Sequence, residues 1–96
     1  MQFGCASDNV NIPEGVLSED KMVEIIADIQ LLEAAHKTLA LNSAQQKEMK
    51  DTSYIIVFNA HNTTSVEFDS SLRVYTQYPE VFSEIMEKAN RKISNK

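Results

Sequence analysis

The chain is poor in cysteine, glycine and proline, and each scarcity excludes something. A single cysteine, Cys5, leaves no partner for an internal disulfide. Two glycines, Gly4 and Gly15, do not suffice for the glycine-rich loops that cradle phosphates in nucleotide-binding proteins. With only two prolines beside them, the composition suits long helices joined by short connections. No apolar run approaches the roughly 20 residues of a transmembrane helix.

Basic residues are also scarce, and the sequence lacks the common motifs of metal sites and catalytic nucleophiles. Nine basic residues face fourteen acidic ones, which gives a net charge of −5. Nucleic-acid binding needs a basic face that displaces counterions, so we expect no nucleic-acid partner. Two histidines without a cysteine pair do not favour a structural zinc site, and no Gly-x-Ser-x-Gly elbow frames a nucleophile. We therefore expect no cofactor and no enzymatic activity.

What is present is enough for one small folded domain. Ninety-six residues, 43% of them hydrophobic, can bury a modest core. The first seventeen residues are polar and aperiodic, with Pro13 and Gly15 among them. We expect residues 1–17 to be a flexible N-terminal tail or tether and residues 18–96 to be a helical domain.

The strongest helical signal covers residues 18–41. Ser18 is a good N-cap, and seven side chains after it repeat at the i, i+3, i+4, i+7 spacing of an amphipathic helix. They are Met22, Ile25, Ile26, Ile29, Leu32, His36 and Leu39. Asn42 and Ser43 interrupt the pattern, which predicts that this helix ends near residue 41.

Three further helices are predicted from their first turns. Ser43 and Gln46 have the spacing of a capping box, in which two side chains satisfy early backbone N–H groups. Thr64 and Glu67 repeat that spacing. Pro79 suits the first position of a helix, where its missing N–H is no loss. We expect an all-α fold, a small bundle of three to four helices, over residues 18–41, 44–61, 64–77 and 79–94.

The segment 54–58, Tyr-Ile-Ile-Val-Phe, leaves a second fold open. Its β-branched and aromatic residues are typical of a buried strand. Apolar residues within 66–74 alternate in a way that suits a partner strand. An α+β fold with a hairpin through 54–58 and 66–74 is therefore the alternative, although the helix-forming residues before this segment favour a helix.

Ionisable residues on the first apolar stripe are the candidate site. Glu33 and His36 project onto the buried face of the first helix, where unpaired burial is costly. We expect both to be mostly buried and hydrogen-bonded, to each other or to a facing group such as Tyr54. Asp28, at the edge of the stripe, and His61, near a predicted helix end, complete a possible buried polar network. Glu-x-x-His occurs in di-iron bundles, but the second such motif is absent, so we expect no metal.

Val66 and Val74 are candidates of another kind. In the third predicted helix they project away from the stripe formed by Phe68, Leu72 and Tyr75. Single apolar residues off the core face are common, but they become informative when they join a larger exposed patch. We treat Val66 and Val74 as a possible contact surface.

Several motifs follow one another in an order that resembles a known family. They are Pro13, the run from Asp28 through Glu33 to Ala34, Tyr54 with Val57-Phe58 and His61, Phe68-x-x-Ser71-Leu72 with Tyr75, and Pro79. Together they resemble small lipoproteins of Bacteroidetes that are classified as a domain of unknown function, with an Asp…Leu-x-Glu-Ala helix followed by a Phe-x-x-Ser-Leu…Tyr…Pro helix pair. The resemblance runs from about Pro13 to Ile93. It implies an all-helical fold, and therefore a helix over 54–58.

The resemblance also implies a location. Members of that family begin with a lipoprotein signal that ends in a lipidated cysteine. Cys5, preceded by Gly4, sits where that cysteine belongs, although Gln2 stands where an apolar residue is usual. Cys5 is therefore the lipidation candidate, with an incidental thiol as the alternative. We expect a lipid-anchored protein of the cell envelope, facing the periplasm or the cell surface.

These observations lead to two hypotheses about function. The first is a membrane-tethered helical accessory or binding module of the bacterial envelope, which acts by contact with a protein partner. The second is a small-ligand-binding or hydrolytic protein with a polar pocket around Glu33, His36 and His61. Convergence of those three side chains in one cleft favours the second, and a filled core around them favours the first.

Overall fold

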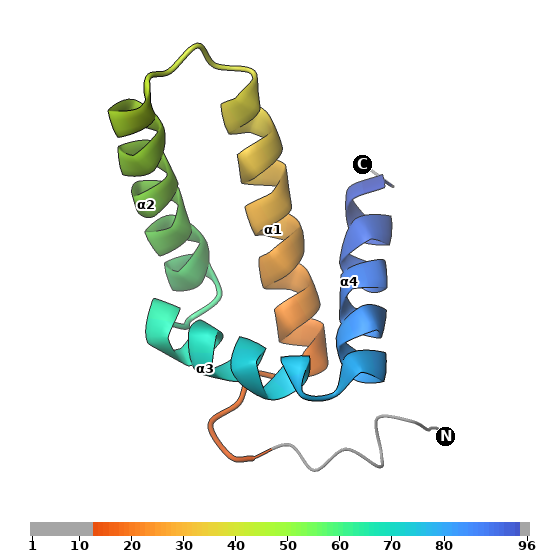
Figure 1. Ribbon diagram of the computed structural model, residues 1–96. Helices are drawn as coiled ribbons and strands as arrows, with labels where there is room; N and C mark the ends of the chain where they lie inside the picture. The colour runs from red at the N-terminus through yellow and green to blue at the C-terminus, as the bar shows by residue number, and fades with distance from the viewer. Residues whose placement is uncertain (1–12, 95–96) are drawn as a thin grey trace.

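The computed structural model describes residues 13–94, and these residues form four helices (Figure 1). The helices are α1 (Glu19–Lys37), α2 (Ser43–Ala60), α3 (Ser65–Thr76) and α4 (Pro79–Ser94). The described residues include no strand, so the all-α prediction is confirmed and the hairpin alternative is wrong.

The helical state of residues 54–58 follows from which side chains the fold buries. Val57 and Phe58 are neighbours in sequence and both are buried, whereas Ile55 and Ile56 are 60% and 62% exposed. A strand would put Val57 and Phe58 on opposite faces, but a helix puts them on one broad face. Burial of that face against α1 overrides the strand propensity of the β-branched residues.

Capping side chains fix where α2 begins. The N-cap is Asn42, whose Oδ1 accepts from the backbone N–H of Gln45 at 2.8 Å. The Gln45 side chain accepts from the N–H of Asn42 at 3.1 Å, which completes a capping box one residue earlier than the predicted Ser43–Gln46 pair. Gln46 instead donates its amide to the carbonyl of Leu41.

The start of α3 is close to the prediction, but only half of the predicted capping box forms. The Thr64 hydroxyl accepts from the backbone N–H of Glu67 at 3.1 Å. The Glu67 carboxylate does not reach back to the cap. It accepts instead from the hydroxyl of Thr63, which is itself buried.

The end of α1 comes four residues earlier than expected. Thr38 is the C-cap, and both its backbone N–H and its hydroxyl donate to the carbonyl of Ala35. Leu39 lies beyond the helix and is 45% exposed. The apolar periodicity of the sequence therefore continues past the point where a local threonine bond closes the helix.

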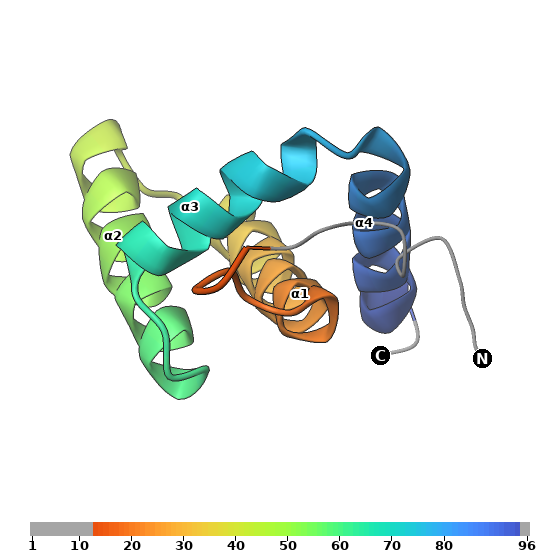
Figure 2. The same cartoon turned by 90° about the horizontal axis from the view of Figure 1, so that it is seen from below.

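The helices form a shallow assembly with α1 at its centre. Figure 1 shows α2 and α4 on the two sides of α1, and Figure 2 shows α3 crossing one end of the molecule between them. The main core lies toward that end, where the first half of α1 meets α3 and the buried face of α4. Its fully buried side chains include Met22, Ile25, Tyr75, Ile85 and Ala89.

The structured region begins before Ser18. The N–H of Leu17 donates to Ser71 Oγ at 2.9 Å, and the Tyr75 hydroxyl donates to the carbonyl of Leu17 at 2.6 Å. Val16 and Leu17 also pack against the core. These two residues of the predicted tail are thus held on α3, while residues 1–12 lie outside the described part of the chain.

Candidate functional site

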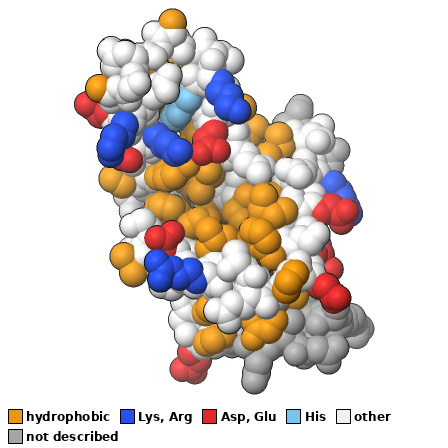
Figure 3. Space-filling view, in the orientation of Figure 1, with side chains coloured by type: hydrophobic (Ala, Val, Ile, Leu, Met, Phe, Trp, Pro, Cys, Tyr) orange, Lys and Arg blue, Asp and Glu red, His pale blue; other side chains and the backbone are white. Residues whose placement is uncertain are grey.

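An apolar groove opens on the face of the molecule shown in Figure 3, where hydrophobic side chains gather between α2 and α4. α1 forms its floor, α2 and α4 form its walls, and α3 closes one end. Its volume is about 380 Å³. Its apolar lining includes Ile29, Phe58, Phe68, Leu72, Phe82 and Met86.

The apolar face of α4 is wider than the surface that α1 covers. The apolar side chains left uncovered line the groove. Val81, Ile85 and Ala89 are buried. Phe82 and Met86 lie beside them on the helix surface and line the groove, where both stay half-buried. Across the groove from α4, the ring of Phe58 on α2 packs against the ring of Phe68 on α3 at a centroid distance of 5.3 Å.

Two carboxylates, one amide and two hydroxyls are the polar side-chain groups that line the groove. Gln30 Oε1 is buried and accepts no hydrogen bond from the described residues. The carboxylates of Glu33 and Asp69 also line the groove, and no lysine or arginine does. Asp69 forms no ion pair among residues 13–94. The groove therefore combines an apolar surface with a buried amide oxygen that has no donor and with a carboxylate, Asp69, that has no ion-pair partner among residues 13–94.

Glu33 is held at the upper edge of this groove by α2. Its Oε2 accepts from the Tyr54 hydroxyl at 2.7 Å and lies 3.6 Å from Lys50 Nζ. Burial, with the hydrogen bond to Glu33 and the negative charge of Glu33 adding to it, raises the pKa of Tyr54 to about 12. The bond to Tyr54 is one of those expected from the sequence.

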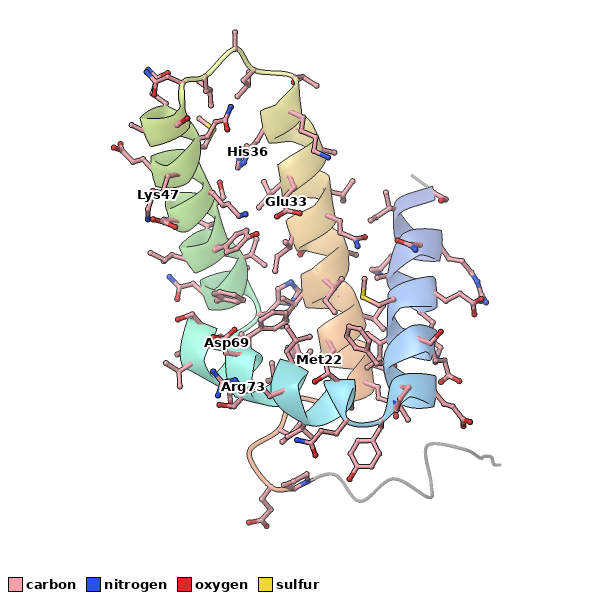
Figure 4. The ribbon with its side chains drawn as sticks, viewed as in Figure 1. Met22, Glu33, His36, Lys47, Asp69 and Arg73 are labelled. Atoms are coloured by element: carbon pink, nitrogen blue, oxygen red, sulfur yellow. The ribbon has the colours of Figure 1, made fainter. Side chains whose placement is uncertain are left out.

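Glu33 is less buried than its helical projection predicts, with 40% of the side chain exposed. The reason is the position of α3, which covers only the first half of α1. The second half, where Glu33 lies, is flanked by α2 and α4 but has no helix across it (Figure 4).

His36 lies one turn further along α1 and faces α2 (Figure 4). Its Nε2 is 3.4 Å from Ser53 Oγ, and the residue is half-buried. A second hollow of about 290 Å³ lies beside it, lined also by Glu33, Lys37, Gln46 and Lys50. Its lining is polar and carries charges of both signs.

His61 forms a separate pair with Asp28. Its Nε2 is 2.8 Å from Asp28 Oδ2, and only 14% of the His61 side chain is exposed. His61 is also the C-cap of α2, and its backbone N–H bonds to the carbonyls of Val57 and Phe58. The pair therefore ties the end of α2 to the middle of α1.

The predicted polar network is thus divided into separate contacts. Ser53, which meets His36, and His61 are eight residues apart on α2, which corresponds to about 12 Å of helix. His61 lines neither of the two hollows described above. Glu33, His36 and His61 do not share a cleft there, and this arrangement does not favour the hydrolytic or ligand-binding alternative.

The other predicted site residues have different surroundings. Val66 is 74% exposed, and Val74 is half-buried. Cys5 lies outside the described residues. Within residues 13–94, no three histidine, cysteine, aspartate or glutamate side chains gather as they would around a metal ion. None of the four helices combines the length and apolar character needed to cross a bilayer.

Fold and groove together define a small all-α domain with an open apolar groove. Over residues 13–96 the chain matches the family described as Domain of unknown function (DUF4296), and it belongs to that family. The match begins at Pro13 and includes all four helices. No curated protein and no solved structure matches the chain.

The groove is the part of the site that the sequence did not reveal. Gln30, Phe82 and Met86 were not singled out as site residues. One signal was present in the sequence, because the apolar face of the last helix holds six residues and is wider than one packing contact needs: Val81, Phe82, Ile85, Met86, Ala89 and Ile93. That width indicates a second surface against which the helix can pack.

Proposed function

We propose that this protein is a membrane-tethered accessory module of the bacterial cell envelope, which binds a partner protein and catalyses no reaction. The observation that carries the proposal is the open apolar groove. Its lining residues Phe82, Met86 and Leu72 are only half-buried, although a small chain has few apolar side chains to spare. Contiguous apolar surface left open on a small domain is typical of an interaction site.

The tether is supported by the resemblance to Bacteroidetes lipoproteins and by the position of Cys5. If Cys5 carries the lipid, the chain between it and Val16, the first residue packed on the core, reaches at most about 40 Å. The helical domain then stays close to the membrane surface and can still turn toward a neighbouring protein. Val66, exposed on α3, provides a further apolar contact next to the groove-forming helices.

The location is tested by replacing Cys5 with serine in the full-length precursor and fractionating the cells. We expect Cys5→Ser to move the protein from the membrane fraction to the soluble fraction, because the anchor is lost. Ala6→Ser, one residue away, is the matched control and leaves the protein in the membrane fraction. Unchanged membrane association of Cys5→Ser contradicts the anchor, and a turnover that depends on His36 or His61 contradicts the non-enzymatic assignment.

A further inference from the structure

The length and width of the apolar groove are suited to the binding of one helix. Its floor runs along α1 from Ile26 to Glu33, a rise of seven residue steps, which is about 10 Å or two helical turns. Packed helices lie about 8–10 Å apart, so the axes of α2 and α4, one on each side of α1, are separated by up to about 20 Å. A helix of about 10 Å diameter can then lie over α1, with α2 and α4 on its two sides.

The chemistry of the groove lining indicates which side chains the bound helix has. The floor and walls are apolar, and they match a stripe of side chains at i, i+3 or i+4, and i+7. Asp69, which forms no ion pair among residues 13–94, adds negative charge to the lining, whereas the charge of Glu33 is offset by Lys50 at 3.6 Å. Gln30 Oε1 is buried without a donor. The whole chain is acidic, with a net charge of −5. These features are complementary to a helix with basic residues beside its apolar stripe.

Other occupants fit less well. A second copy of this chain brings another net charge of −5, which repels the first. A fatty acid offers a matching apolar tail, but its carboxylate would meet the carboxylates of Glu33 and Asp69 in the lining, and the nearby ammonium of Lys50 is already paired with Glu33. A basic amphipathic helix satisfies the apolar surface and the acceptors together.

We propose that the apolar groove binds an amphipathic helix of a partner protein, seated by apolar side chains over two turns and by a lysine or arginine that pairs with Asp69. The inference rests on the proposed function as a contact protein and deepens it. It does not depend on the lipid anchor.

The test titrates a synthetic amphipathic helix into the purified chain. The probe is a leucine–lysine peptide of about 14 residues, a length at which isolated helices are marginal and gain order on binding. It has leucines at i, i+3, i+4 and i+7, and fluorescence anisotropy reports binding. One control peptide has the same composition in scrambled order, and a second carries glutamate in place of lysine. We expect saturable binding of the leucine–lysine helix, and at least tenfold weaker binding of both controls.

Two variants locate the binding surface. Leu72→Asp places a charge in the groove and is expected to weaken binding at least tenfold. Ile56→Asp makes the same change of charge on α2, at a position that is 62% exposed and outside the groove lining, and is expected to change binding less than about twofold. Equal effects of the two variants overturn the proposal, because they show attraction by net charge alone.

A charge reversal keeps the test decisive if Leu72→Asp fails to fold. Asp69 is exposed, so Asp69→Lys leaves the core untouched. Asp69→Lys is expected to weaken binding of the leucine–lysine peptide at least fivefold and to strengthen binding of the peptide that carries glutamate. An unchanged preference overturns the pairing with Asp69.

Any one of three further results shows that the groove does not bind a partner helix. The scrambled peptide binds as tightly as the leucine–lysine helix, or a neutral lipid displaces the peptide. In the third, the chain alone forms a dimer that Leu72→Asp abolishes. Failure of this test leaves the Cys5→Ser fractionation unaffected, so the groove and the envelope location are judged separately.

Discussion

Tyr54 and Glu33 illustrate at the residue scale how a half-exposed carboxylate is held at the edge of an apolar groove. The tyrosine donates to the carboxylate, and the ammonium of Lys50 lies both 3.6 Å from Glu33 Oε2 and 5.6 Å from the centre of the Tyr54 ring. Ionised Tyr54 would lose its donor and face a negative neighbour. The contact therefore favours neutral Tyr54.

This contact predicts how Tyr54 titrates. In Glu33→Gln the charge is removed, so we expect the pKa of Tyr54 to fall from about 12 and to remain above its ordinary value of 10, because burial is the larger cause of the shift. Ultraviolet titration of the tyrosines measures this, and Tyr54→Phe identifies the signal. A titration curve that is identical in Glu33→Gln shows that Glu33 does not act on Tyr54.

The same shift sets a pH range for stability. The folded-state pKa of Tyr54 is raised, so its contribution is fully present below pH 10 and is lost as the pH rises to about 12. We expect the free energy of unfolding of the wild-type chain to fall over that range. In Tyr54→Phe the fall is expected to be smaller, because Tyr54 no longer contributes to it.

The two histidines offer a matched comparison. His61→Ala is expected to lower the free energy of unfolding by about 1–2 kcal/mol, because a buried side chain with a 2.8 Å bond to Asp28 is lost. His36→Ala is expected to cost less than about 0.5 kcal/mol, since His36 is half-buried and its contact with Ser53 is 3.4 Å long. Urea unfolding compares the two, and a larger loss for His36→Ala contradicts this ranking.

At the scale of the elements, α3 is the part that joins the others. It crosses the end of the molecule between α2 and α4, and it also holds the segment that precedes α1. Ser71, fully buried on α3, accepts from the N–H of Leu17 and donates to the carbonyl of Glu67. One hydroxyl thus satisfies two backbone groups.

Removing that hydroxyl tests the role of α3. Ser71→Ala leaves the N–H of Leu17 without its partner, and we expect a loss of about 1–3 kcal/mol in the free energy of unfolding. Ser70→Ala, at the exposed neighbouring position, is the control and is expected to change stability by less than about 0.5 kcal/mol. If hydrogen exchange at Leu17 is as slow in Ser71→Ala as in the wild type, the bond does not hold this segment.

Much of each helix was predictable because the signals are local. Ser18, Thr64 and Pro79 begin or precede helices within one residue of the prediction. The end of α1 was not predictable from the apolar pattern, because Leu39 keeps the periodicity while Thr38 closes the helix with its own hydrogen bonds. Local capping therefore outweighs a single apolar residue that finds no surface to pack on.

At the scale of the whole molecule, the sequence predicted which polar residues need partners, but it named only some of the partners they have. Tyr54 was among the groups expected to face Glu33, and it does. The pairing of Asp28 with His61 depends on how α2 packs along α1, which no single segment specifies. The groove depends on all four helices at once, so it becomes visible only when they are placed together.

The central claim, that the protein acts by contact through the groove, is tested most directly by site-specific photocrosslinking in the native cell envelope. A photoreactive phenylalanine analogue replaces Phe82, which lines the groove, or Ile56, which is 62% exposed on α2 and does not line it. We expect one discrete protein adduct from position 82 that is absent from position 56. No adduct from position 82, or the same adducts from both positions, contradicts the claim.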